Sequence, residues 1–340
     1  MPSVWPSSWQ SLSSWLVVWL AASSSHAGRS LLQDSSTGSL EDNFYDSSCP
    51  SAEFIVRQLV GKAVASEPRM AGSLLRLHFH DCLVQGCDAS LLLESIPGVL
   101  EGEQEARPNI NSMRGFEVVD DIKEALERQC PDVVSCADIL AMAARDSVAV
   151  SGGPSYRVLL NRRDSLTDSR SLANQALPGF NFNVSNLIDN FASVGLSEAD
   201  MVVLSGGHTI GKANCNTFAA RLTPNADDPT ALEAAYKESL TRQCPAGVAS
   251  NAFVDLDVAT PTLFDNGYYS NLLASRGLLH SDQVLYSTAG TMRSLVERYA
   301  NSKSAFFADF STAMIKMGNI APLVGSTQGE VRARCGFTNS

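Results

Sequence analysis

Residues 76–82 read RLHFHDC. This stretch places a guanidinium, two imidazoles, a carboxylate and a thiol beside two apolar side chains. In a helix, Arg76, Phe79 and His80 share one face because they lie three and four residues apart, whereas His78 points away. One base and one fixed cation on an apolar wall indicate a reaction site. The alternative is a buried structural histidine with an arginine at the surface beside it.

The next segment, LVQGCDAS at residues 83–90, adds oxygen donors and a glycine turn. Carboxylates, a hydroxyl and main-chain carbonyls are hard oxygen ligands of the kind that calcium prefers. A bridge between Cys82 and Cys87 would close this loop, so the segment predicts a calcium site. Its donors are Asp81, Val84, Gly86, Asp88 and Ser90. A polar loop closed by a disulfide, without a metal, is the alternative.

Composition and charge limit the possible functions of the chain. Of the 340 residues, 44% are hydrophobic, which is enough for a globular core in one large domain or two ordinary ones. The formal net charge is -11 and the pI is near 4.9. Because an acidic surface repels phosphate backbones, nucleic acid is not an expected partner.

The N-terminal segment is typical of a secretory signal peptide. The apolar run over residues 12–22 is too short to span a bilayer, and Ser25 and Ala27 are small residues at the two positions that a signal peptidase reads. We expect cleavage near Ala27, which separates a signal peptide, residues 1–27, from a single domain, residues 28–340. Because no Lys or Arg precedes the apolar run, a signal anchor remains open. No later stretch approaches a membrane span.

The cysteine content agrees with secretion. Eight cysteines in a chain with a signal peptide predict four disulfides. Zinc is the alternative, but zinc sites favour closely paired cysteines, and only Cys82 and Cys87 lie close together here. Asn183 begins the sequence Asn-Val-Ser, so it is a candidate glycosylation site.

Helical periodicity dominates the chain. Ser135 and Ser197 are candidate N-caps because each stands three residues before an aspartate. A helix after Ser197 would end at the glycine pair 206–207. YRVLL, at residues 156–160, is a short strand-like run. Further helices are expected at residues 51–66, 70–83, 115–130, 291–300 and 306–318. In the first of them, the expected buried face consists of Phe54, Ile55, Leu59, Val60 and Ala63.

His208 follows two glycines in LSGGHTIG, residues 204–211. Glycines have no side chain, so they let a flat group approach the main chain closely. A haem iron with one histidine ligand fits that opportunity. A histidine that only caps the last carbonyls of a helix is the alternative.

Seven motifs, in order along the chain, resemble those of the secreted plant (class III) haem peroxidase family. They are RLHFHDC, GCDASLLL, VSCADIL, GGPSYRV, LSGGHTIG, FDNGYY and SDQ, and the resemblance covers roughly residues 43–337. It implies a mostly α fold in which distal and proximal helical halves sandwich the haem, with short minor β segments. It also implies haem b and two Ca²⁺ ions as cofactors.

The resemblance assigns roles on the distal side of the haem. His80 matches the general base that takes a proton from hydrogen peroxide. Arg76 matches the cation that stabilises the charge developing as the O–O bond breaks. Asn109 matches the acceptor of the Nδ1 proton of that histidine, and Glu103 matches the glutamate that supports this asparagine. Phe79 would wall the pocket, so that donors meet the haem edge.

The resemblance also assigns roles on the proximal side. His208 matches the axial ligand of the haem iron, and Asp282 matches the carboxylate that accepts its Nδ1 proton. Pro178 matches a residue at the substrate edge. The implied ligands of a second calcium are Thr209, Asp257, Thr260, Leu263 (through its carbonyl) and Asp265. The implied disulfides are Cys49–Cys130, Cys82–Cys87, Cys136–Cys335 and Cys215–Cys244.

Two positions depart from the family pattern. Phe180 stands where the substrate edge usually has a second proline, and Asn161 stands where glycine is common. Neither belongs to the iron chemistry, although Phe180 bears on which phenols bind. The tail ends five residues after Cys335, without a long extension, which favours the apoplast and cell wall over the vacuole.

The expected activity follows from the resemblance. The enzyme, expected to be a monomer, would reduce hydrogen peroxide and oxidise small phenolic donors in one-electron steps. The family's roles include lignin and suberin formation, cell-wall cross-linking, auxin oxidation and oxidative stress. Two alternatives are a catalytically silent calcium-binding wall protein on the same scaffold and a zinc hydrolase that uses His78 and His80.

Overall fold

The computed structural model describes residues 38–96, 101–223, 228–245 and 252–339. The expected signal peptide and its cleavage site lie outside these residues. The described chain belongs to one compact unit. Within these ranges, no helix combines the length and the apolar composition that crossing a membrane requires.

Helices dominate the described chain, as expected from the sequence, and the regular β structure within it is one two-stranded sheet. In that sheet, β1 (Lys212–Asn214) and β2 (Phe253–Asp255) are antiparallel, with Ala213 opposite Val254. The helices are α1 (Ala52–Ser66), α2 (Met70–Val84), α3 (Phe116–Gln129), α4 (Cys136–Val150), α5 (Arg170–Ala176), α6 (Val184–Ser193), α7 (Glu198–Ser205), α8 (Ala234–Gln243), α9 (Gly267–Leu273), α10 (His280–Ser287), α11 (Thr291–Asn301) and α12 (Lys303–Gly318).

Side-chain caps explain where two of these helices begin. The Ser135 hydroxyl accepts a hydrogen bond from the main-chain N–H of Asp138 at the start of α4. At the start of α7, Ser197 and Asp200 each accept a hydrogen bond from the other's main-chain N–H. Such caps satisfy N–H groups that have no partner within the helix. Both predicted caps are confirmed, and α7 ends at Ser205, directly before the glycine pair, as predicted.

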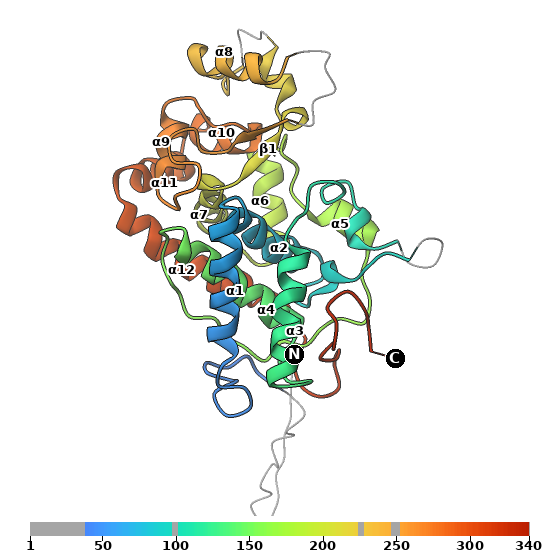
Figure 1. Ribbon diagram of the computed structural model, residues 1–340. Coiled ribbons are helices and arrows are strands. Elements are labelled where there is room, and N and C mark those ends of the chain that lie inside the picture. The colour runs from blue at the N-terminus through green and yellow to red at the C-terminus, as the bar shows by residue number, and fades with distance from the viewer. Residues whose placement is uncertain (1–37, 97–100, 224–227, 246–251, 340) are drawn as a thin grey trace, which may run out of the picture. The chain divides into compact units, whose positions relative to one another are not determined.

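The first helical half is built around α4, which packs against α1, α2 and α3 (Figure 1). Residues 136–148 of this helix are all buried. A helix that is buried on all sides must be surrounded by other elements. Because α2 rests on α4, the face of α2 that points away from α4 is left for the second half of the molecule.

The second half consists of α6, α7 and the helices from α9 onward. α11 packs against α7, α9 and α10, and α12 packs against α7 and also touches α2. A smaller core lies beneath α8, which is at the top of Figure 1. This smaller core consists of Cys215, Phe218, Leu232, Tyr236, Leu240, Cys244, Val254 and Leu278.

The expected buried face of α1 is wrong at one position. Phe54 is 68% exposed, and the fully buried residues of the helix are Ala52, Val56 and Val60. α1 packs against α4, and small or β-branched side chains at the contact allow the two helices to approach closely. The apolar periodicity predicted the helix correctly, but it did not show which of the apolar residues contact α4.

The strand predicted at residues 156–160 is also wrong. Leu160 forms only an isolated bridge with Glu41, and the rest of the segment is irregular. A strand needs a partner that runs alongside it. Here the segment around Glu41 pairs with Leu160 only, so the β-branched and aromatic residues of 156–160 do not form a strand.

Four disulfides connect the described elements, with the pairing that the resemblance implies. Two of them hold distant segments together, since one joins the start of α1 to the end of α3 and another joins the start of α4 to the C-terminal tail. The pairs are Cys49–Cys130, Cys82–Cys87, Cys136–Cys335 and Cys215–Cys244.

A buried ion pair holds the segment after α4 against the first helical half. Nη1 of Arg162 lies 2.8 Å from Oδ1 of Asp138, and the two side chains are 1% and 0% exposed. Asp138 also accepts hydrogen bonds from the Tyr45 hydroxyl and the Asn161 main-chain N–H. Nε of Arg162 donates to the carbonyl of Gly318 at the end of α12. This guanidinium therefore ties both halves together.

We expect Arg162→Met to lower the free energy of unfolding by about 3–5 kcal/mol, because it leaves the Asp138 charge buried without its partner. The matched control is Arg157→Met. Arg157 pairs with Asp42 at the surface and is 63% exposed, so its removal should cost no more than about 1 kcal/mol. Chemical denaturation measures both. Equal losses for the two variants would contradict the prediction.

Candidate active site

One face of α2 is accessible in the interior of the molecule. Gly72, Ser73, Arg76 and Phe79 are each partly exposed, whereas the residues on the other faces of the helix are buried. These positions follow helical spacing and continue to His80, which is 7% exposed. The face predicted from RLHFHDC therefore exists, and it is the face that points away from α4.

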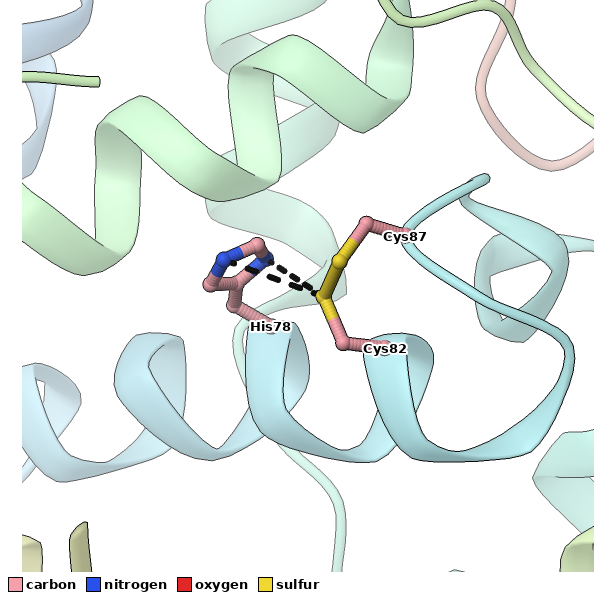
Figure 2. A group of neighbouring side chains, drawn as sticks. All are labelled: His78, Cys82 and Cys87. Carbon is pink, nitrogen blue, oxygen red and sulfur yellow. Dashed lines mark hydrogen bonds between the residues drawn. A yellow bond between two sulfur atoms is a disulfide. The ribbon is translucent and has the colours of Figure 1, made fainter. Parts of the chain in front are cut away.

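His78 lies on the opposite side of α2, as predicted, beside a disulfide (Figure 2). Its Nδ1 is 3.5 Å from Sγ of Cys82, which is bonded to Cys87. Sulfurs in a disulfide are not thiolates, so this group of three side chains is not a metal site. Burial and the charge of Arg162 lower the pKa of His78 to about 3, so the ring is neutral. His78 and His80 do not converge, which excludes the zinc hydrolase.

His80 is held in one tautomer by a chain of hydrogen bonds. Its Nδ1 lies 2.6 Å from Oδ1 of Asn109, and Nδ2 of Asn109 donates to the main-chain carbonyl of Glu103 at 2.8 Å. Because the amide nitrogen of Asn109 is turned toward that carbonyl, its oxygen faces His80 and accepts the Nδ1 proton. Burial, and then the charge of Arg76, lower the pKa of His80 well below its usual value. Nε2 is therefore an unprotonated base.

Arg76 is a fixed cation next to that base. Its Nε donates to Nε2 of His80 at 3.1 Å, and Nη1 donates to the carbonyl of Ser112 at 3.1 Å. Nη2 donates to the carbonyl of Pro108 at 2.7 Å. Burial lowers the pKa of Arg76 to about 10, so the guanidinium remains charged at neutral pH. The 108–112 segment thus positions both Arg76 and, through Asn109, His80.

His208 lies in the short 3-10 helix η3 (Gly206–Thr209), which continues from α7. Gly206 is required there, since a Cβ on it would come within 2.4 Å of the Tyr269 hydroxyl. Nδ1 of His208 lies 2.8 Å from Oδ1 of Asp282 in the first turn of α10. Burial lowers the pKa of His208, but the charge and hydrogen bond of Asp282 outweigh burial, and the pKa is raised overall.

His80 lies on α2 and His208 on η3, two elements that pack together, and the pKa of His80 responds to His208. The side chain of His208 is 41% exposed, although burial is the largest influence on its pKa. Arg76 lowers the pKa of His208, and His208 lowers the pKa of His80, so the two sides act on each other. The His208 side chain is thus accessible to solvent although protein surrounds it, so it borders an internal space. This arrangement fits a planar group held between two histidines.

The loop after α2 gathers buried carboxylates. Asp81 accepts hydrogen bonds from the main-chain N–H groups of Ala89 and Leu91, and Asp88 accepts one from Ser90. Burial, and then the charge of Asp88, raise the pKa of Asp81 well above its usual value. Such a pair of buried acids needs a cation to balance it.

The buried oxygens near this loop also fit a bound cation. Oγ of Ser90 and both carboxylate oxygens of Glu103 are buried near each other and make no hydrogen bond of good geometry. Burial raises the pKa of Glu103 to about 8. Val84 ends α2, and Gly86 follows with a φ of 121°, where a Cβ would meet the carbonyl oxygen of Ala321 at 2.4 Å. These residues fit a calcium ion.

A second oxygen cluster lies beside His208. The Thr209 hydroxyl is 3.3 Å from Oδ2 of Asp257 and 3.4 Å from Oδ1 of Asp265. The Thr260 hydroxyl is 3.4 Å and 3.2 Å from the same two oxygens. Hydroxyl hydrogen bonds of this length do little to reduce the repulsion between the two carboxylates. A cation between the four oxygens would neutralise their charge. Leu263, the fifth expected ligand, has a 43% exposed side chain, and its role would use the carbonyl.

Pro178, the residue expected at the substrate edge, is half-buried, and Phe180 is 46% exposed. The carbonyl of Phe180 accepts a hydrogen bond from the Ser281 N–H at 3.0 Å, which connects this segment to α10. On the α2 side, the ring of Phe79 lies 5.6 Å from His80 and 6.1 Å from Phe191. Phe79 is therefore a packed wall beside the base.

Sequence reasoning missed two parts of the site. Tyr268 donates to Oδ1 of Asp282 at 3.1 Å, the oxygen that also faces His208. Ser112 and Pro108 supply the carbonyls that hold Arg76. The motif FDNGYY contains Tyr268 and could have drawn attention to it, but no sequence signal identifies a carbonyl that happens to lie near a side chain.

Comparison with known proteins identifies the family. A family model described as Peroxidase matches residues 56–302. The chain is 51% identical over 302 residues to peroxidase P7 of Brassica rapa subsp. rapa, covering 88% of this chain and 100% of the relative. It is 51% identical over 305 residues to peroxidase 40 of Arabidopsis thaliana, covering 88% and 86%. It is 50% identical over 300 residues to the lignin-forming anionic peroxidase of Nicotiana sylvestris, covering 88% and 91%. The chain belongs to the peroxidase family, as its motifs predict, and it is an enzyme with peroxidase activity.

Proposed function

We propose that this peroxidase is a secreted, monomeric enzyme that uses haem b to reduce hydrogen peroxide and to oxidise small phenolic donors in one-electron steps. One observation carries the proposal: His80 and His208 lie on two elements that pack together, and their pKa values are shifted in opposite directions. The former is a neutral base of low pKa held by Asn109, and the latter has a raised pKa and is held by Asp282.

The residues fit haem. Nε2 of His208 would hold the iron, because Nδ1 is engaged by Asp282. When bound, haem supplies an iron centre that takes up the two oxidising equivalents of one peroxide molecule. Donation of the Nδ1 proton toward Asp282 gives His208 imidazolate character, which favours high oxidation states of a metal that it binds.

His80 would move one proton within the peroxide. Its Nε2 accepts the proton from one peroxide oxygen and then donates it to the other, so that the departing oxygen leaves as water. The low pKa keeps Nε2 unprotonated before peroxide arrives, and it makes protonated His80 beside the charge of Arg76 a strong acid for the second transfer. Asn109 keeps the Nδ1 proton in place throughout, so only Nε2 takes part.

Arg76 would stabilise negative charge on the departing oxygen. Its Nε now donates to His80, and the approach of peroxide would transfer that hydrogen bond from the base to the substrate. The other guanidinium nitrogens stay on the 108–112 carbonyls, so little reorganisation is needed. A cation that is fixed before the reaction acts more strongly than one that must move into place.

Phenolic donors would react at the edge near Pro178 and Phe180, because Phe79 walls the α2 side. One relative is named a lignin-forming anionic peroxidase, and this chain is also acidic, with a net charge of -11. The exposed Phe180 ring offers an apolar surface to an aromatic donor. Profiling coniferyl alcohol, ferulate and guaiacol with Phe180→Pro would show whether this ring selects among donors.

We further propose that both oxygen clusters bind calcium. The distal set is Asp81, Val84, Gly86, Asp88 and Ser90, and the proximal set is Thr209, Asp257, Thr260, Leu263 and Asp265. Asp81 directly follows His80, and Thr209 directly follows His208. Loss of either ion would therefore disturb a catalytic histidine, beyond any loosening of a loop.

We expect Asp257→Asn to retain calcium at least about 10-fold less tightly, because it removes one of two carboxylates from the proximal cluster. The haem absorption spectrum should shift as well, since Thr209 anchors η3. Calcium content after dialysis against a chelator, together with the spectrum, measures both effects. Asp255→Asn is the matched control, because Asp255 pairs with Lys212 at the surface. An Asp257→Asn protein with full calcium and an unchanged spectrum would refute the assignment.

Secretion is supported by the N-terminal apolar run and the four disulfides. We propose removal of residues 1–27, which leaves a single catalytic domain, residues 28–340, in the apoplast or cell wall. Asn183 is exposed, and its Oδ1 caps α6. A glycan would attach to the amide nitrogen, so glycosylation is compatible with the cap.

The test of the proposed function uses the purified protein. A haem absorption band that changes on addition of hydrogen peroxide and recovers as guaiacol is oxidised would support it. A protein that binds calcium but neither binds haem nor oxidises guaiacol would contradict it.

A further inference from the structure

Three buried tyrosines form a row that begins at His208. The ring centroids of His208 and Tyr268 are 6.2 Å apart, and Tyr268 lies 5.0 Å from Tyr269. Tyr269 in turn lies 5.1 Å from Tyr299. These are the separations of aromatic rings in contact. The row therefore connects the candidate haem site on η3 with α11 through α9.

The outer end of the row lies just below the surface. Tyr299 is 1% exposed, and its hydroxyl donates to Oδ2 of Asp309 at 2.9 Å. The same oxygen pairs with Nη1 of Arg298, and the side chains of Asp309 and Arg298 are 36% and 51% exposed. One carboxylate thus stands between the phenol and solvent.

Each end of the row has a base for a phenolic proton. Tyr268 donates to Asp282, as Tyr299 donates to Asp309. A phenol loses an electron far more easily when a hydrogen-bonded base takes its proton, because a cation radical in an apolar interior is costly. Tyr269 donates only to main-chain carbonyls of α7, which are weak bases. It therefore serves as a bridge between the two ends.

The composition around the row leaves tyrosine as the oxidisable aromatic residue. All four tryptophans precede residue 20 of the chain. Phe306 packs against the row at 5.1 Å from Tyr269 and 6.1 Å from Tyr299, and a phenylalanine ring is much harder to oxidise than a phenol. Tyr286 lies outside the row, against Arg293.

We propose that this row carries one oxidising equivalent from the haem site to Tyr299 when no donor occupies the edge. The inference rests on the proposed peroxidase chemistry, which supplies the oxidant. One electron moves inward from Tyr299 through the row, its phenolic proton moves to Asp309, and a neutral tyrosyl radical remains. A soluble one-electron reductant that approaches Asp309 returns the electron, and Asp309 returns the proton. The row is a second point of reduction that requires no binding at the edge.

The experiment is electron paramagnetic resonance on haem-loaded protein, freeze-quenched after one equivalent of hydrogen peroxide without donor. We expect a tyrosyl signal whose splitting collapses in protein that contains ring-deuterated tyrosine. Tyr299→Phe, which lacks only the hydroxyl, should lose the signal. Asp309→Asn should lose it too, because the ring remains but the base is gone. Both variants should oxidise guaiacol normally, since neither residue touches the site.

The matched control is Tyr286→Phe, which should keep the full signal. Three results would overturn the relay: no tyrosyl signal in the unaltered protein, a full signal in Tyr299→Phe, or loss of the signal in Tyr286→Phe. Guaiacol oxidation separates this inference from the proposed function. Protein that oxidises guaiacol but shows no radical contradicts the relay alone, whereas protein that does not oxidise guaiacol contradicts both.

Discussion

The His80→Leu variant is expected to react with hydrogen peroxide about 10²- to 10⁴-fold more slowly than the unaltered enzyme, because general acid–base catalysis contributes about that much. Leucine fills a similar volume and cannot move the proton between the peroxide oxygens. The measurement is stopped-flow absorbance of the haem band after mixing with peroxide. Haem content should be unchanged, since His80 is not the proposed ligand.

Two comparisons sharpen this prediction. Asn109→Leu keeps the base but frees its tautomer, so we expect a smaller loss of about 10- to 100-fold, typical for a group that orients a functional histidine. His280→Gln tests a histidine outside the site, which hydrogen-bonds Thr230, and it should react within about twofold of the unaltered rate. A His80→Leu protein that reacts at the unaltered rate would remove this residue from the mechanism.

The His208→Ala variant is expected to retain haem at least about 100-fold less tightly, because even the loss of a partner of a metal ligand costs about 10- to 100-fold in affinity. Haem retention is measured by the ratio of haem to protein absorbance after gel filtration. Any haem that remains should show an altered spectrum, since its ligation would change.

Asp282→Asn is a milder change at the same site. An asparagine oxygen still accepts a proton from Nδ1 of His208 but carries no charge, so haem should remain bound while its reduction potential rises. Potentiometry reads this directly. His208→Ala protein with the full haem complement and an unchanged spectrum would show that another residue holds the iron, and the proposed arrangement would then be wrong.

Local chemistry could be predicted from the sequence where near neighbours decide it. The caps at Ser135 and Ser197 each accept a hydrogen bond from the main-chain N–H three residues later, and both are present. The opposite directions of His78 and His80 follow from helical geometry alone. In contrast, the exposure of Phe54 and the irregular 156–160 segment depended on partners that are distant in the sequence, and both expectations failed.

Glu103 shows what the tertiary structure adds to a matched motif. The resemblance assigned it support of Asn109, and the structure provides that support through the main-chain carbonyl. Its carboxylate instead lies buried near Ser90 and Asp88, and burial raises its pKa to about 8. A residue that matches a family motif does not by itself reveal whether its side chain or its main chain makes the contact.

From the sequence alone, Arg76, Phe79 and His80 could be placed on one helical face and Ser135 and Ser197 at helix starts, because each placement depends on residues within about one turn of each other. The packing of distant segments brings Asn109 to His80, Asp282 to His208, and Tyr268 to the same oxygen of Asp282. Those contacts join segments far apart along the chain. Their geometry is set by how α2, η3, α9 and α10 pack, and no spacing within a single segment records it.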